Sequence, residues 1–264
     1  MEIRHPLTEF TAYIILLLFI SFSLSPYSLG VILLGLILMK PRTIPVVLIV
    51  VTLTTVINPL VNHKGETYLF YLNDNIVTLE SVIYGVVLGM QVSSLILAFK
   101  LMSDNMTSDK IISVTSYLAP PLALVLSMAI RSLGRYTRKT GEVYRLQKSF
   151  APGGNFFYRI IVLINTFSIM IGWILENSIE TADSMVVRGY GSHRRTTYHN
   201  IRISIRDFLE ILVIIGVFIL FLLTRADTVI IPFIYIGFDA VNLVATIVFV
   251  IYLIIYNKMQ IDYK

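Results

Sequence analysis

The sequence predicts an all-α fold: a polytopic membrane helical bundle of about five or six spans, with two long amphipathic helices on its cytoplasmic side. Three observations predict it. Hydrophobic residues make up 56% of the chain and charged residues 14%, against about 45–50% and about 25% in soluble domains. The apolar residues gather in runs close to the roughly 20 residues that a helix needs to cross hydrocarbon. Most basic residues fall in one central region. This pattern argues against a water-soluble enzyme.

Six apolar runs are the candidate membrane segments: 10–24, 29–39, 44–60, 81–101, 208–223 and 229–256. The first two are short, so they form either a pair of short helices or a re-entrant hairpin, and both arrangements leave the same topology. No small-residue cleavage site follows the first run, so we expect no cleavable signal. The chain has no cysteine, which removes disulfides, thiolate metal sites and a cysteine nucleophile.

The basic residues orient the predicted bundle. Of the 21 Lys and Arg residues, 14 fall between Lys100 and Arg206. The positive-inside rule then places this region and both termini in the cytoplasm, as expected for a multi-pass protein of the plasma membrane. The sequence predicts N-terminal membrane helices in 1–102, a cytoplasmic region with two long helices in 103–206 and C-terminal membrane helices in 207–264. Two further apolar stretches, 118–130 and 160–175, would form a membrane hairpin only by placing many bases outside.

Two long cytoplasmic helices are predicted within this region. The first begins at Pro120, since proline suits a first helical turn, and stops at the Pro-Gly-Gly sequence 152–154. The second runs from about Phe156 to Arg188 and stops at Gly189. A basic stripe at helical spacing marks the first helix, and an acidic stripe marks the second. The basic stripe is Arg131, Arg135, Arg138 and, with Glu142 between them, Arg145; the acidic stripe is Glu176, Glu180 and Asp183.

The two stripes are either solvated faces or partners of each other. Exposed pairs contribute only about 0–1 kcal/mol each, whereas breaking a buried pair costs about 3–5 kcal/mol. We predict at least one Arg–acid pair between the helices. Its candidates lie nearest the apolar helix ends: Arg131 or Arg135 with Glu176 or Glu180.

The second helix carries a recognisable motif. Residues 182–191 read Ala-Asp-Ser-Met-Val-Val-Arg-Gly-Tyr-Gly and are followed by Arg195 and Thr196. This stretch resembles the signature of the transmembrane T component of energy-coupling factor (ECF) transporters. Shorter matches extend the resemblance over roughly residues 56–207: Leu126–Arg131, Tyr144–Gln147, Thr78–Glu80, Tyr84, Gly85, Asn58, Pro59, Gly65 and Thr67.

The resemblance implies a non-catalytic subunit of an ABC-type importer of micronutrients such as vitamins or metals. Two cytoplasmic ATPases would bind this chain, which would also hold a membrane-embedded substrate-binding S component. The chain would sit in the lipid bilayer, bind no nucleic acid and need no cofactor. ATP and Mg²⁺ would be bound by the ATPases, and the chain itself lacks a Walker A motif. The substrate would be set by the S component.

The resemblance also implies one ATPase-docking motif at the end of each cytoplasmic helix. The second motif is Val187, Arg188 and Gly189. A cation at a helix C-terminus is favoured by about 0.3–1 kcal/mol, and a guanidinium donates a planar fork to carboxylates and carbonyls; the alternative is a simple helix cap. The first motif departs from the family pattern, because Phe150 and Ala151 stand where Arg-Gly is usual. This motif is therefore weaker, or uses Lys148 or Arg145, or relies on packing of Ser149 and Phe150. Its candidate residues at the helix end are Gln147, Lys148, Ser149 and Phe150.

Two other classes of function compete with this one. A stand-alone secondary transporter or channel needs polar residues in several spans, and the candidates are Gln91, Asp239 and Asn242. Asp239 is either functional, as acids inside a membrane often are, or makes a buried hydrogen bond with Asn242, with Tyr235 or with a helix end. An intramembrane enzyme needs a convergent catalytic set, which the sequence does not show. The four histidines are scattered without zinc-ligand spacing: His5, His63, His193 and His199.

Overall fold

The chain folds as two compact units. The computed structural model describes residues 5–23, 25–62, 65–72, 75–150, 156–192, 204–224, 228–229, 235–236 and 239–261. Unit 1 combines Met1–Thr107 with Ile203–Lys264, and unit 2 is Ser108–Arg202. These boundaries lie close to the predicted ones at 102 and 206. The N-terminal and C-terminal membrane segments, predicted as separate parts, pack together in one unit.

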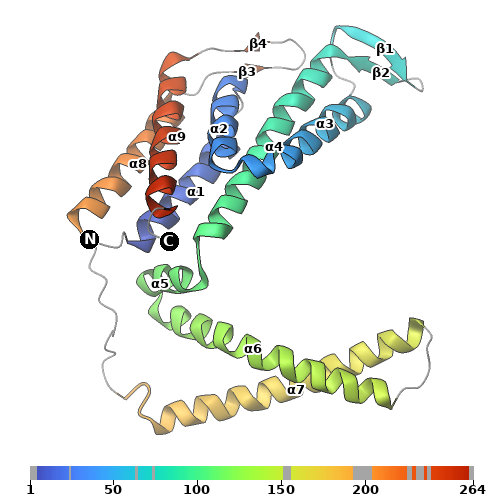
Figure 1. The fold of residues 1–264 in the computed structure, drawn as a ribbon, viewed down its shortest axis with the longest axis vertical. Coiled ribbons are helices and arrows are strands. Elements are labelled where there is room, and N and C mark those ends of the chain that lie inside the picture. Colours follow the sequence, from blue (N-terminus) through green and yellow to red (C-terminus); the bar gives the residue numbers. More distant parts are fainter. Residues whose placement is uncertain are drawn as a thin grey trace. The chain divides into compact units, whose positions relative to one another are not determined.

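The described residues are mainly helical (Figure 1). Unit 1 has one 3-10 helix, η1 (Pro41–Thr43), and two short antiparallel hairpins, β1–β2 (Tyr68–Leu72, Asn75–Thr78) and β3–β4 (Thr228–Val229, Tyr235–Ile236). Its α-helices are α1 (Pro6–Phe22), α2 (Pro26–Met39), α3 (Ile44–Val61), α4 (Leu79–Asn105), α8 (Ile205–Leu223) and α9 (Ala240–Ile261). The helices of unit 2 are α5 (Ser108–Leu118), α6 (Pro120–Ser149) and α7 (Phe156–Val187).

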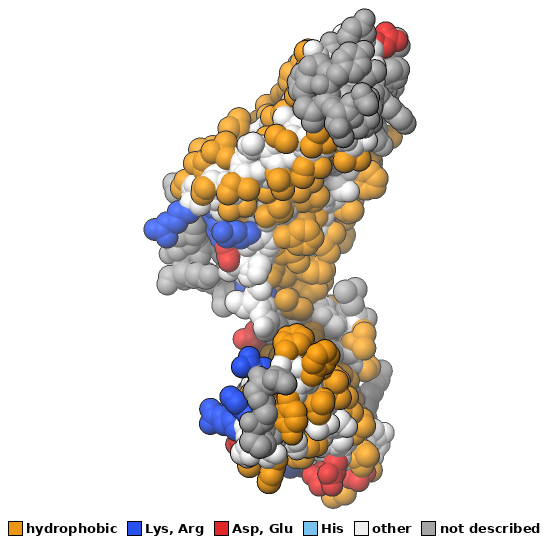
Figure 2. All heavy atoms as spheres, turned by 90° about the vertical axis from the view of Figure 1, so that its right-hand side faces the viewer, with side chains coloured by type: hydrophobic (Ala, Val, Ile, Leu, Met, Phe, Trp, Pro, Cys, Tyr) orange, Lys and Arg blue, Asp and Glu red, His pale blue; other side chains and the backbone are white. Residues whose placement is uncertain are grey.

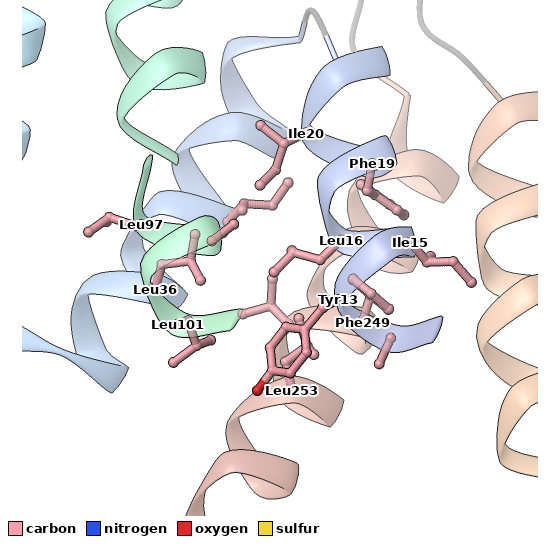
Figure 3. Close-up of a cluster of buried hydrophobic side chains, with 14 of the residues drawn as sticks. Tyr13, Ile15, Leu16, Phe19, Ile20, Leu36, Leu97, Leu101, Phe249 and Leu253 are labelled. Carbon is pink, nitrogen blue, oxygen red and sulfur yellow. The ribbon is translucent and has the colours of Figure 1, made fainter. Parts of the chain in front are cut away.

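Helix α1 forms the centre of the unit 1 core. It contacts α4 and α8, and its side chains Leu16, Phe19 and Ile20 are fully buried. The Phe19 ring lies 3.8 Å from the Phe221 ring of α8 and 5.4 Å from the Phe249 ring of α9, measured between ring centroids. Figure 3 shows these apolar side chains from α1, α2, α4 and α9 meeting in one cluster. The short first run therefore forms a helix of its own, with one face buried in the core.

Helices α3 and α4 pack with their backbones unusually close. A Cβ atom added at Gly89 would lie 2.4 Å from Thr54 Oγ1 and 2.9 Å from Val51 Cα. A Cβ atom at Gly85 would lie 3.0 Å from the Thr54 carbonyl oxygen. Glycine thus permits an approach that any side chain would block. Near one end of this contact, Asn58 Nδ2 of α3 donates a hydrogen bond of 2.6 Å to the Ser81 carbonyl of α4.

The C-terminal end of α4 is tied to three other segments of unit 1. Asn105 Nδ2 donates to Tyr13 Oη of α1 at 2.7 Å and to Asn257 Oδ1 of α9 at 3.2 Å. Lys40, between α2 and η1, forms an ion pair with Asp104. This helix end directly precedes unit 2 in the chain, so it is held at the point where the two units are joined.

In the described part of the chain, four helices are long and apolar enough to cross a membrane: Pro41–Val61, Leu79–Asn105, Phe156–Val187 and Ala240–Asn257. Helices α1 and α2 are apolar but shorter, at 17 and 14 residues. These helices indicate an all-α membrane protein. The set differs from the six predicted runs, because it includes α7, which we expected at the cytoplasmic surface, and does not include α8, whose first two turns carry Arg206, Asp207 and Glu210.

The last predicted run, 229–256, is not one helix. Helix α9 begins only at Ala240, and residues 228–229 pair with 235–236 in the β3–β4 hairpin. The sequence between the helices contains Pro232 and Gly237 among β-branched and aromatic residues. Proline and glycine disfavour a helix interior, and β-branched residues favour strands. The apolar run was therefore misinterpreted from hydropathy alone.

Candidate functional site

The predicted cytoplasmic helices are present in unit 2 and cross each other. Helix α6 begins at Pro120 and helix α7 at Phe156, as expected. At the crossing, the rings of Tyr136 and Trp173 meet edge to face with centroids 5.8 Å apart. Asn177 Nδ2 donates a long hydrogen bond of 3.5 Å to Tyr136 Oη. Edge-to-face aromatic pairs contribute about 0.5–1.5 kcal/mol beyond their burial.

A stripe of side chains on each helix faces the other helix along this contact. On α7 the stripe is buried or half-buried and consists of Val162, Thr166, Met170, Trp173 and Asn177. On α6 the half-buried counterpart consists of Ser132, Tyr136, Lys139, Val143 and Gln147. We call these two sets the packing stripes. They contain none of the arginines and acids that we expected to join the helices.

The predicted Arg–acid pair is absent from the structure. Arg131, Arg135 and Arg138 are exposed, and so are Glu176, Glu180 and Asp183. The described residues contain no ion pair between the two sets.

Two of the arginines, Arg135 and Arg138, turn back onto their own helix. Arg135 contacts Ser132 Oγ at 3.4 Å, with its guanidinium 5.8 Å from the Tyr136 ring, and Arg138 Nε donates to the Gly134 carbonyl at 3.2 Å. Each arginine of the predicted pair directly precedes a residue of the α6 packing stripe, so it lies beside the contact and is exposed: Arg131, Arg135 and Arg138. The spacing of these residues does place them on one side of each helix. The prediction that this side faces the other helix was wrong.

The end of α7 is a Schellman motif built on Gly189. The Tyr190 N–H donates to the Met185 carbonyl at 3.0 Å, and the Gly189 N–H donates to the Val186 carbonyl at 2.9 Å. Gly189 has φ of +83°, the left-handed conformation that this cap requires and that favours glycine. Arg188 is the last residue before this turn. The helix cap that the sequence offered as the alternative is thus present, and it places Arg188 at the end of the helix.

The tip of α7 is open to solvent. Val187 is 87% exposed, and Arg188 is exposed and has no ion pair within the described residues. A guanidinium fixed at the end of a long helix by a glycine cap can donate to carboxylates or carbonyls of another chain.

The end of α6 also carries an exposed side chain. The helix ends at Ser149, whose hydroxyl donates to the Leu146 carbonyl at 2.7 Å. Phe150 follows and is 79% exposed, Lys148 is exposed, and Gln147 is half-buried in the packing stripe. Ala151 and the rest of the loop to 155 lie outside the described residues. This tip therefore offers an aromatic ring and an ammonium group where the α7 tip offers a guanidinium.

The two tips lie at opposite ends of the crossed pair (Figure 1). Ser149 is 13 residues beyond Tyr136, and Val187 is 14 residues beyond Trp173. At about 1.5 Å per residue, each tip is about 20 Å from the crossing.

The sequence prediction did not include the residues at the crossing, Tyr136, Trp173 and Asn177. It also did not include helix α5, which contacts α6. A signal for the crossing was present, because the packing stripe of α7 recurs at steps of three and four around Trp173, the single tryptophan of the chain.

The polar residues considered for a transporter have structural partners. Asp239 Oδ1 accepts the Val241 N–H at 3.0 Å, so it caps α9. Asn242 is buried and donates to the Phe221 and Thr224 carbonyls at the end of α8. Gln91 Nε2 donates to the carbonyls of Ile20 and Ser21.

Histidine offers no metal centre in the described residues, where no cluster of three or more His, Asp or Glu side chains occurs. His5 Nδ1 accepts the Leu7 N–H at the start of α1. His63, His193 and His199, like Arg195 and Thr196 of the signature, lie outside the described residues.

Comparison with known proteins adds no relative. No protein-family model matches the chain, and no curated protein matches it. Fold and site define a class: an all-α membrane protein with a separate helical unit formed around a crossed helix pair.

Proposed function

We propose that this chain is the membrane scaffold and coupling subunit of an ECF-type importer. In this role it transmits the ATP-driven movement of two cytoplasmic ATPases to a membrane-embedded S component that carries a vitamin or metal. The chain itself is not an enzyme, because ATP and Mg²⁺ are bound by the partner ATPases. Both of its termini and unit 2 lie on the cytoplasmic side of the plasma membrane.

One observation carries the proposal: two exposed helix ends lie at similar distances along their helices from one aromatic crossing. Two similar ATPases need two docking points that move together, and a crossed pair of rigid helices offers them. The signature around Arg188 supports the same role. The differing tips, Phe150 with Lys148 at one end and Val187 with Arg188 at the other, imply that the two ATPase contacts are not equivalent.

Purification of the tagged chain from its native membrane in a mild detergent tests the proposal. We expect two ATPase chains and one small membrane protein to accompany it, in a ratio that native mass spectrometry measures. A stand-alone transporter or channel is instead isolated without ATPases and moves solute when reconstituted alone. That outcome would sink the proposal.

A further inference from the structure

The crossed pair of unit 2 has two unlike sides, which follow from its packing stripes. Only six residues of the chain separate α6 from α7, and the two helices run in opposite directions along their contact (Figure 1). In right-handed helices that run antiparallel, residues that precede the packing stripe on either helix point to the same side of the pair. Residues that follow the stripe on either helix point to the opposite side.

The first side, which we call the charged side, contains both predicted charge stripes. On α6, Arg131 and Arg135 directly precede Ser132 and Tyr136 of the packing stripe. On α7, Glu176 directly precedes Asn177, and the later acids follow it at helical spacing. All charged members of this side are exposed: Arg131, Arg135, Arg138, Glu142, Arg145, Glu176, Glu180 and Asp183. Ile161, Asn165 and Ile169 also lie on this side.

The second side, which we call the apolar side, contains no acid. Its α7 stripe consists of exposed residues at steps of four, three, four and four: Phe156, Ile160, Leu163, Phe167 and Ile171. On α6 its members directly follow the packing stripe and include Leu133, Thr137, Thr140 and Tyr144. Phe167 is 69% exposed and Leu133 is 56% exposed. Figure 2 shows a broad hydrophobic area on unit 2, with blue and red side chains at its borders.

We infer that the apolar side of the α6–α7 pair lies on the lipid bilayer, with Phe167 and its neighbours at the boundary between headgroups and acyl chains. Unit 2 is joined at both ends to the apolar helices of unit 1, because α4 ends three residues before α5 and α8 follows at Ile205. This linkage keeps the pair at a membrane surface. A helical face with large apolar residues opposite a charged face is the pattern that binds in the interfacial plane.

Basic residues complete this pattern. Lys148 and Arg159 are exposed at the loop end of the pair, and both fall at the border of the apolar side by their helical position. Long basic side chains there reach the headgroup layer while their stems stay on apolar surface. Between residues 131 and 159 the chain has seven basic residues and one acid. Such an excess favours a leaflet with anionic headgroups.

The same geometry argues against α7 as a membrane span, although α7 is long and apolar enough for one. The first half of α7 packs along the second half of α6 through Val162, Thr166 and Met170. A spanning α7 would therefore carry Arg138 and Arg145 of α6 into hydrocarbon, where charged side chains are costly. An interfacial pair buries the apolar side and leaves the charged side in water.

Spin-label accessibility tests the inference on the full chain, which has no native cysteine. A nitroxide is attached at Phe167→Cys on the apolar side and, as the matched control, at Asn165→Cys on the charged side. Each protein is reconstituted without partners in vesicles of phosphatidylcholine and phosphatidylglycerol. We expect collisions of the Phe167 label to favour oxygen over a water-soluble nickel chelate several-fold, and those of the Asn165 label to favour the chelate.

Three results would overturn the inference. If both labels favour the chelate, the pair lies in water. If both favour oxygen, α7 spans the bilayer. If the label at 167 is shielded from both reagents, protein rather than lipid covers the apolar side. A second pair of positions, Ile171→Cys and Gly172→Cys, repeats the comparison in case the first pair does not fold, since a Cβ at Gly172 meets no atom within 4 Å. No ATPase is needed, so this test is independent of the proposed function.

Discussion

Two polar side chains of this protein, Arg188 and Asn105, lie at helix ends. Arg188 directly follows Val187, the last residue of α7, and precedes the left-handed Gly189. Asn105 stands at the last position of α4 and joins it to α1 and α9. Helix ends leave backbone groups without intrahelical partners, so a polar residue there can serve both the cap and a neighbouring chain segment.

We predict that Arg188→Ala weakens recovery of one ATPase with the chain and lowers coupled uptake, while membrane insertion is unchanged. A hydrogen bond to a charged group contributes about 1.5–3 kcal/mol, so affinity should fall about ten- to a hundredfold. Quantitative copurification and uptake in vesicles measure the two effects. Arg131→Ala, an exposed arginine remote from the tip, is the control. Normal assembly and uptake by the Arg188 variant would remove the docking role.

We predict that Asn105→Leu destabilises unit 1 by about 1–3 kcal/mol, because Tyr13 Oη and Asn257 lose their shared donor in a buried setting. The midpoint of thermal unfolding in detergent measures the effect. Asn165→Leu, at an exposed position of α7, should leave the midpoint nearly unchanged. Equal midpoints for the two variants would contradict the role given to Asn105.

At the scale of elements, two contacts between helices differ in kind. Helices α3 and α4 meet at glycines of α4, where an added Cβ atom would clash with α3. Helices α6 and α7 meet through side chains around one aromatic pair. The first contact is rigid because atoms touch along the backbone, and the second depends on a few larger side chains.

We predict that Gly89→Ala lowers the thermal midpoint of the chain by several degrees, since its Cβ would meet Thr54 Oγ1 at 2.4 Å and Val51 Cα at 2.9 Å. Gly30→Ala in α2 is the matched control, because nothing lies within 4 Å of its Cβ. In a helix interior that change should stabilise by up to about 1 kcal/mol. We expect the thermal midpoint to fall in Gly89→Ala and to rise in Gly30→Ala. If both variants lose stability equally, the close packing at Gly89 is not the cause.

For α6 and α7 we predict that the aromatic pair couples the helices and the charge stripes do not. A double-mutant cycle of Tyr136→Ala and Trp173→Ala should give a coupling energy of about 0.5–1.5 kcal/mol. The cycle of Arg135→Glu and Glu176→Arg should be additive within about 0.5 kcal/mol, because both side chains are exposed and unpaired. A coupling energy well above about 0.5 kcal/mol in the charge cycle would instead support the predicted Arg–acid pair.

At the scale of the whole molecule, the distribution of basic residues predicts the orientation of the chain in the membrane. Most basic residues of the chain lie in or beside unit 2, and the positive-inside rule is read over such segments. We predict that a cysteine replacing Ser149 resists an impermeant thiol reagent in intact cells, whereas one replacing Asn62 reacts. Permeabilised cells, in which both sites react, provide the control. The reverse pattern would invert the topology.

The sequence by itself determined the elements with strong local signals. Pro120, the Pro-Gly-Gly sequence at 152–154 and Gly189 mark the limits of α6 and α7, because proline and glycine act on the backbone locally. The helical spacing of arginines and acids also predicted two real stripes. Hydropathy was less specific. It predicted one continuous segment over the β3–β4 hairpin and α9, because short apolar strands and helices cannot be told apart by composition.

Only the tertiary structure decided which way the stripes point and what surrounds each helix. Tyr136, Trp173 and Asn177 form the crossing, and this contact turns the arginines and the acids outward on one side. Asp239, isolated within an apolar run of the sequence, caps α9. Helical periodicity specifies the relative angles of side chains around one helix, but the direction of the whole set depends on the packing of large side chains from distant segments.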